Sequence, residues 1–156
     1  MQSCRINLER NFNLGGTTVM KGAIIPYLTF YGKGKEAAEF YINLLGLEQV
    51  EMQKYSDANF PHPPEAADYL LHCHLKKGDF QIMLADSVDK LPENNKHGVT
   101  LLIDCESEEE ANRLYDGLRK EGEVLMELQV TFWGAKYGKV KDKFGFTWDL
   151  NCEKEG

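Results

Sequence analysis

The chain repeats one pattern of apolar and polar positions twice. The first copy opens with a β-branched and aromatic run, Ile24–Tyr31, which ends at Gly32-Lys33-Gly34. Apolar side chains then recur every three to four residues, which predicts a helix with one buried stripe, and Gly46 is well placed to end it. The stripe comprises Ala37, Phe40, Tyr41, Leu44 and Leu45.

Three extended segments follow this helix, at Leu47–Tyr55, Tyr69–Leu75 and Phe80–Ala85. The sequence Lys77-Gly78-Asp79 separates the last two. A short turn that contains glycine, placed between two strand-like runs, favours a hairpin. The first copy therefore predicts a strand, a helix and three further strands.

The second copy has the same order. Val99–Cys105 is an apolar strand, and Ser107 followed by Glu110 has the spacing of a capping box, which predicts the start of a helix. Gly122 is predicted to end this helix. The helical stripe comprises Ala111, Leu114, Tyr115 and Leu118, and the later extended segments are Val124–Thr131, Tyr137–Val140 and Phe144–Cys152, with a turn near Lys143.

This order predicts an α+β protein of paired βαβββ modules that form curved mixed sheets around a cavity. Module one spans about residues 22–86, a linker about 87–97 and module two about 98–152, within a single domain at 21–156. Residues 1–20 are polar and unpatterned, and we interpret them as a flexible N-terminal extension. An ordered arm that contacts a partner is the alternative.

Alternation along the strands assigns each side chain to one face of its sheet. Because one helix covers only one face, apolar positions belong to the helix side and mixed positions to the other side. Two mixed concave faces are typical of a small-molecule cavity, although simple contact with water is the alternative. The mixed set comprises His72, His74, Gln81, Met83, Thr147, Asp149 and Asn151.

Charge and composition exclude several classes of partner. The 156 residues carry a net charge of −7 without a block of basic residues, so nucleic acid and membrane surfaces are not expected partners. No apolar run is long enough to cross a bilayer, and we expect a cytoplasmic protein. The cysteines (Cys4, Cys73, Cys105 and Cys152) form no CxxC pair, and we interpret the last three as reduced core residues.

Three segments carry a resemblance to a known family. They are Ile25–Phe30, Glu36–Gly46 and a stretch in which Phe132-Trp133-Gly134 leads through Tyr137-Gly138 to Asp142–Trp148. With these segments the chain resembles the vicinal-oxygen-chelate superfamily of glyoxalases, bleomycin-resistance proteins and dioxygenases, and its PhnB-like branch. The resemblance implies a homodimer whose modules associate edge to edge, with a small organic molecule bound in a concave cavity.

Metal-dependent members of this superfamily hold a divalent ion with side chains from the first and last strand of each module. The resemblance places these four positions at Pro26, about Met83, about Val99 and Asp149. Only Asp149 is a suitable ligand, so we expect a protein without a metal or other cofactor. The alternative is a divalent-metal lyase, isomerase or dioxygenase with a rearranged site at His72, His74 and Asp149.

Further residues are candidates for the cavity. The loop Asp57–Asp68 holds three prolines and Phe60, and we interpret it as a lid. Trp133 and Tyr137 lie in a segment broken by glycines, so they are either core residues or ligand contacts. The predicted ligand cavity comprises Phe60, His72, His74, Met83, Trp133, Tyr137 and Asp149.

The same relatives are sometimes described as methyltransferases that act on a ubiquinone precursor. The glycine-rich sequence Gly32-Lys33-Gly34 lacks a full GxGxxG pattern. We interpret it as a turn that opens a helix, with anion binding by its backbone N–H groups as the weaker alternative. The sequence also shows no nucleophile and base in a recognisable arrangement, so it leaves open whether the protein is an enzyme.

Overall fold

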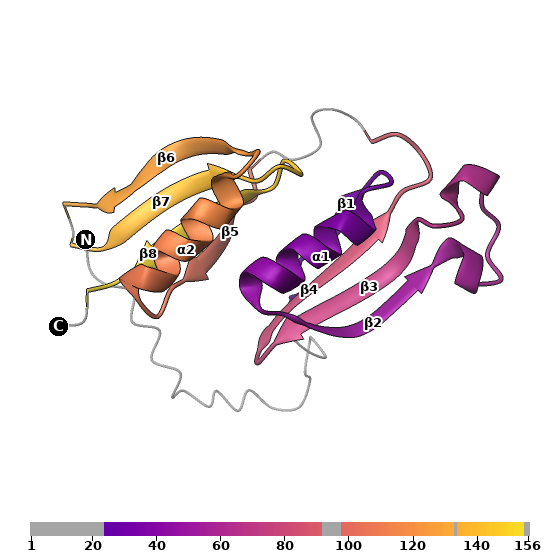
Figure 1. Cartoon of the computed structure of the whole chain (residues 1–156), viewed down its shortest axis with the longest axis horizontal. Helices are drawn as coiled ribbons and strands as arrows, with labels where there is room; N and C mark the ends of the chain where they lie inside the picture. Colours follow the sequence, from indigo (N-terminus) through magenta and orange to yellow (C-terminus); the bar gives the residue numbers. More distant parts are fainter. Residues whose placement is uncertain (1–23, 92–97, 133, 155–156) are drawn as a thin grey trace, which may run out of the picture.

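A computed structural model describes residues 24–91, 98–132 and 134–154, and it shows two βαβββ modules (Figure 1). The first module contains β1 (Tyr27–Phe30), α1 (Gly34–Leu45), β2 (Glu48–Lys54), β3 (Leu70–Lys77) and β4 (Phe80–Asp86). The second contains β5 (Leu101–Asp104), α2 (Glu108–Arg119), β6 (Glu123–Val130), β7 (Lys136–Lys141) and β8 (Thr147–Cys152). The predicted α+β class and the order of elements are confirmed.

Each module forms its own four-stranded mixed sheet. Sheet A has the order β1-β4-β3-β2, and sheet B has the equivalent order β5-β8-β7-β6. In each sheet the first strand pairs in parallel with the last, as Tyr27 does with Met83 and Leu102 with Asp149, and the other pairs are antiparallel. The identical order of strands confirms the internal repeat.

Local sequence sets the ends of both helices. Gly46 follows α1 in the left-handed conformation at φ 65°, and its N–H donates to the carbonyl of Ile42. At the start of α2, Ser107 Oγ accepts a hydrogen bond of 3.1 Å from the N–H of Glu110. The Glu110 carboxylate accepts from the N–H of Glu106, one residue earlier than an ideal capping box requires.

The prediction that Gly122 ends the second helix is wrong, because the helix ends earlier and another residue takes the left-handed conformation. Helix α2 ends at Arg119, and the residue in the left-handed region is Glu121, at φ 59°. Gly122 is instead needed for close packing, because a Cβ atom there would lie 2.4 Å from the backbone oxygen of Lys141 in β7. The glycine therefore lets the chain enter β6 directly against β7.

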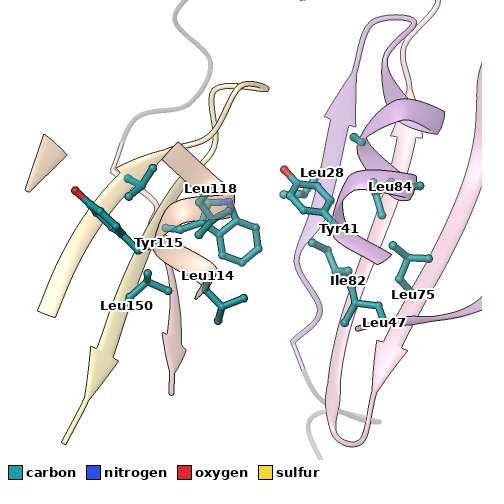
Figure 2. Close-up of a cluster of buried hydrophobic side chains, with 14 of the residues drawn as sticks. Leu28, Tyr41, Leu47, Leu75, Ile82, Leu84, Leu114, Tyr115, Leu118 and Leu150 are labelled. Carbon is teal, nitrogen blue, oxygen red and sulfur yellow. The ribbon is translucent and has the colours of Figure 1, made fainter. Parts of the chain in front are cut away.

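Both modules contribute to one hydrophobic core (Figure 2). The helical stripes and the helix-facing side chains of the strands form it, as the alternation predicted. Trp148 and Leu150 of β8 and Ile82 and Leu84 of β4 are fully buried. Because both sheets turn one face to this shared core, the opposite face of each sheet points away from it. We call these opposite faces the open face of sheet A and the open face of sheet B.

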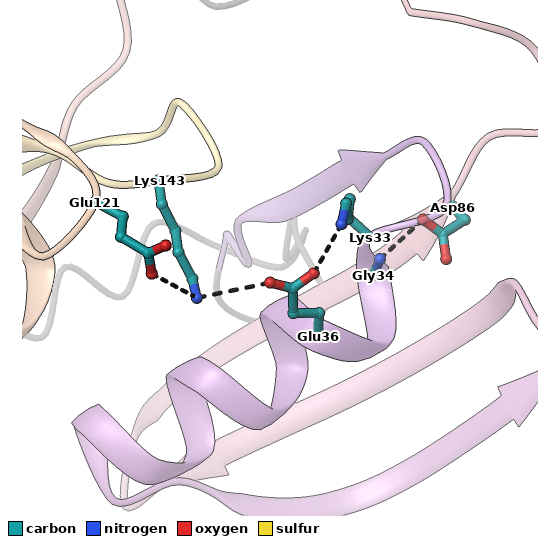
Figure 3. Close-up of polar contacts among 6 residues, drawn as sticks. All are labelled: Lys33, Gly34, Glu36, Asp86, Glu121 and Lys143. Atoms are coloured by element: carbon teal, nitrogen blue, oxygen red, sulfur yellow. Dashed lines mark hydrogen bonds and ion pairs between the residues drawn. The ribbon is translucent and has the colours of Figure 1, made fainter.

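Side chains on the helix side join the two modules. The ring of Tyr41 in α1 lies 5.6 Å from the ring of Trp148, and Arg113 of α2 donates a hydrogen bond of 2.8 Å to the carbonyl of Leu44. Lys143, in the turn between β7 and β8, bridges Glu36 of α1 and Glu121 (Figure 3). These contacts hold the modules together through their helices.

No helix in the described part of the chain combines the length and the apolar character that a membrane crossing requires.

Candidate functional site

The open face of sheet A carries two paired histidines on β3. His72 Nδ1 forms a hydrogen bond of 3.0 Å with the hydroxyl of Tyr27 on β1, and His74 Nε2 lies 2.8 Å from Oε1 of Gln81 on β4. Glu51 on β2 is near the other ring nitrogen of His72, at 3.9 Å. Both histidines are half-buried, so this face holds ordered polar groups rather than freely solvated ones.

Met83 lies at the centre of this face, because it pairs with Tyr27 on one side and His74 on the other. Tyr27 is 51% exposed. Partial burial, followed by the charges of Tyr55 and Cys73, raises its pKa, so its phenol stays protonated and can donate a hydrogen bond near neutral pH. The sequence analysis missed Tyr27, since its position on this face depends on the parallel pairing of β1 with β4.

The open face of sheet B carries a second polar group formed by Tyr137 and Lys139 of β7 with Asp149 of β8. Lys139 pairs in register with Asp149, and its Nζ lies 3.5 Å from Oδ1 of the carboxylate. Burial, followed by a hydrogen bond to Asp149 and its charge, raises the pKa of Tyr137 to about 12. Lys139 was also missed, although the two-residue period from Tyr137 could have found it.

The loop before β3 is folded into two short 3-10 turns, η1 (Tyr55–Asp57) and η2 (Pro64–Ala66). The ring of Phe60 packs edge-on against Tyr55 at 5.8 Å and is 53% exposed. His62 also packs against Tyr55 and hydrogen-bonds to the carbonyl of Phe60. This loop is ordered beside sheet A, and its action as a lid stays a prediction.

The predicted cavity residues thus fall into separate groups within one chain. His72, His74 and Met83 lie together on sheet A, and Tyr137 and Asp149 lie together on sheet B. Phe60 belongs to the loop, and Trp133 lies outside the described residues. Within the described ranges, no three His, Cys, Asp or Glu side chains are grouped to hold a metal ion, so one chain does not assemble the alternative site at His72, His74 and Asp149.

Strand register corrects two of the positions inferred for metal ligands. The residue beside Met83 on β1 is Tyr27 rather than Pro26, and the residue beside Asp149 on β5 is Leu102 rather than Val99. Pro26 and Val99 precede their strands. With this correction the four positions are Tyr27, Met83, Leu102 and Asp149. Met83 and Leu102 offer no hard oxygen or nitrogen ligand, so these four side chains are not the usual ligand set for a divalent ion.

A carboxylate of the chain itself occupies the start of α1 (Figure 3). The N–H of Gly34 donates to Oδ1 of Asp86 at 2.9 Å, and the N–H of Leu70 donates to Oδ2 at 2.8 Å. A Cβ atom on Gly34 would lie 2.7 Å from this carboxylate. Gly32-Lys33-Gly34 is therefore a turn that receives an internal anion, which supports the structural interpretation over an external phosphate.

The fold is that of glyoxalase and bleomycin-resistance proteins. A glyoxylase/bleomycin resistance protein/dioxygenase domain from Frankia sp. EAN1pec superposes with a TM-score of 0.62, covering 88% of this chain and 95% of that domain at 15% identity. This similarity defines the architecture as paired βαβββ modules of that class.

A family model for 3-demethylubiquinone-9 3-methyltransferase matches residues 22–151. Protein YjdN of Escherichia coli (strain K12) is 31% identical over 140 aligned residues, and the alignment covers 83% of this chain and 95% of YjdN. Protein PA1353 from Pseudomonas aeruginosa has a TM-score of 0.76 and 35% identity, covering 85% of this chain and 98% of PA1353. The PhnB protein from Bacillus cereus has a TM-score of 0.73 and 29% identity, with coverage of 84% and 99%. The chain belongs to the family that the 3-demethylubiquinone-9 3-methyltransferase model describes, in the PhnB-like branch of the vicinal-oxygen-chelate superfamily. This result confirms the resemblance seen in the sequence.

Proposed function

We propose that this protein binds a small organic molecule on the open faces of its sheets, and does so without the divalent metal of its superfamily. The pairing of polar side chains on both faces carries the proposal, with the half-buried His74 held by Gln81 and the buried Asp149 near Lys139. Polar groups fixed beside apolar surface are typical of ligand sites, where they set orientation and specificity.

A second copy of the chain completes the site in this proposal. Strands β1 and β5 are edges of their sheets, so their outer backbone groups are open to another strand. Exposed apolar side chains gather at these edges, including Ile24, Tyr27, Val99 and Leu102, the last of which is 58% exposed. A homodimer that joins β1 of one copy to β5 of the other would cover these apolar side chains. It would also bring the open face of sheet A in one copy next to the open face of sheet B in the other.

The compartment that fits this proposal is the cytoplasm. Cys73, Cys105 and Cys152 are buried free thiols, and burial raises the pKa of the first two to about 11. Thiols of this kind are protonated and unreactive near neutral pH, which suits a reducing environment.

The first test is the oligomeric state together with ligand binding by the full chain. Sedimentation should give a dimer, and Leu102→Glu should give a monomer, because a charge at the β5 edge would be buried by pairing. A matched Leu125→Glu variant, on the outer strand β6, should remain a dimer. Monomeric wild-type protein at all concentrations would contradict the proposal.

Small aromatic compounds are then screened by tryptophan fluorescence and thermal shift. Compounds that stabilise the wild-type dimer should bind more weakly to His74→Ala, since Gln81 would lose its hydrogen-bond partner. They should bind with unchanged affinity to the control variant Lys76→Ala, on the same strand. S-adenosylmethionine belongs in the screen, because the family description names a methyltransferase. If none of these compounds binds, the proposed function fails.

Elemental analysis of protein purified without chelator tests the alternative function, a metal-dependent lyase, isomerase or dioxygenase. In a dimer, His72 and His74 of one copy could approach Asp149 of the other, which a single chain does not allow. We expect no stoichiometric metal. A bound ion that is lost in the variant with both His72→Ala and His74→Ala would favour the enzyme instead.

A further inference from the structure

The Asp149 carboxylate has an oxygen whose hydrogen bonding is incomplete. The residue is only 8% exposed, and no described residue donates a hydrogen bond to its buried Oδ1. Leaving a buried carboxylate oxygen without a donor costs free energy, so such an atom needs a physical explanation. On the open face of sheet B, the explanation that fits the proposed function is a donor supplied by the ligand.

Lys139 balances the charge of this carboxylate without satisfying it. Its Nζ lies 3.5 Å from Oδ1, whereas an ammonium that donates to a carboxylate approaches to about 2.7–2.9 Å. The Lys139 side chain is one-third exposed, and its long flexible stem can swing toward solvent. The Lys139 ammonium therefore lies where a hydrogen-bond donor to Oδ1 would lie, and it can move away from this position.

Tyr137 completes this polar group from the same strand. Its hydroxyl remains protonated over the whole neutral range, because burial and Asp149 both raise its pKa. Asp149 thus has the Lys139 ammonium as an ion-pair partner and a hydrogen bond with Tyr137, and what it lacks among the described residues is a donor within hydrogen-bond distance of Oδ1. The net charge of −7 adds a weak general attraction for cations.

We propose that Asp149 receives the protonated amine of the bound small molecule, and that the Lys139 ammonium occupies this place in the empty protein. The inference rests on the proposed function and specifies its ligand class as organic amines. A ligand amine can approach within hydrogen-bond distance of Oδ1, so binding exchanges a loose internal ion pair for a hydrogen-bonded one.

The probes for this inference are 2-phenylethylamine and 2-phenylethanol, which share a carbon skeleton and differ in the charged group. Calorimetry on the full chain at neutral pH should show that the wild type binds the amine about tenfold more tightly than the alcohol, the order expected for one charged hydrogen bond. Asp149→Asn should abolish this preference. Lys139→Met should strengthen amine binding severalfold, because the internal competitor is gone.

Two matched variants on the same open face serve as controls. Asp104→Asn changes a carboxylate that already accepts a hydrogen bond from Asn151, and Lys141→Met removes an ammonium paired with Glu123. Neither should alter the preference for the amine. Circular dichroism of each variant shows whether it is folded, and Lys139→Met tests the inference even if Asp149→Asn does not fold.

The inference is overturned if Lys139→Met weakens amine binding or leaves it unchanged, or if the wild type does not prefer the amine. These results are separable from failure of the proposed function. A neutral compound that binds the wild-type dimer and is lost in His74→Ala would keep the proposed function while the amine inference fails. Absence of any bound compound would remove both.

Discussion

The hydroxyl of Tyr41 donates a hydrogen bond of 2.6 Å to Oδ2 of Asp142, a residue 101 positions further along the chain. Tyr41 belongs to α1 of the first module, and Asp142 lies in the turn between β7 and β8 of the second. The same carboxylate accepts from the Trp148 indole and from the N–H groups of Phe144 and Phe146. At 2% exposure, this one side chain ties the modules together with all its acceptors engaged.

Asp142→Asn should destabilise the protein by about 3 kcal/mol, because the amide nitrogen would face donors that need an acceptor. Tyr41→Phe should cost less, about 1–2 kcal/mol, since it removes one hydrogen bond and leaves the other three. Urea unfolding of both variants and of the double variant measures the free energies. If the two costs simply add, the Tyr41–Asp142 pair is not the coupling that joins the modules.

Asp86 gives a second prediction, at the start of α1. Its carboxylate accepts from the N–H groups of Gly34 and Leu70, so Asp86→Asn replaces one of these acceptors with a donor. We expect a loss of about 2 kcal/mol and faster amide hydrogen exchange at Gly34 and Leu70 in particular. The exposed Asp89→Asn variant is the control. Unchanged exchange at both amides would contradict this account of the helix start.

These two carboxylates show where prediction from the sequence stopped. The helix stripe, the Gly46 end and the Ser107 cap depend on residues a few positions apart, so local spacing identified them. Asp86 and Asp142 would ordinarily be placed at the surface, because charged residues are rarely buried. The donors to Asp86 lie 16 and 52 positions away, and Tyr41 lies 101 positions from Asp142, so local spacing could not indicate these partners. The other three donors to Asp142 lie within six residues of it.

The candidate site was predictable to the same extent. Strand alternation placed His72 and His74 on one face and Asp149 on the open face of its own sheet. It could not show that the modules join through their helices, which turns those two faces away from the shared core. It also could not supply the register that brings Lys139 beside Asp149, since register depends on how the strands pair.

Gly122 leads to a prediction about packing. Gly122→Ala should destabilise the protein by about 2 kcal/mol or more, because the new methyl group would meet the rigid backbone oxygens of Lys141 and Leu118. Gly78→Ala is the comparison: its φ of 57° is strained for alanine, but nothing lies within 4 Å, so its cost should be nearer 1 kcal/mol. Thermal unfolding compares the two. An equal cost would mean that β6 can move away from β7.

The buried thiols predict a loss of stability at alkaline pH. Burial raises the pKa of Cys73 from 9.0 to about 11 in the folded protein, while the unfolded chain keeps the ordinary value. Between these values the unfolded chain releases a proton that the folded protein retains. The protonated Cys73 thiol therefore makes its full contribution to the free energy of unfolding below pH 9. This contribution is lost as the pH rises toward 11, by at most about 1.4 kcal/mol per pH unit for each thiol.

Urea unfolding at a series of pH values from 8 to 11 measures this slope. Cys73→Ala should make the fall in stability shallower, because one of the responsible protons is gone, even though the variant is less stable at every pH. Val140→Ala removes side-chain volume from the same core without a titrating group, so its slope should equal that of the wild type. If Cys73→Ala and the wild type lose stability in parallel, the Cys73 thiol does not titrate as its burial requires.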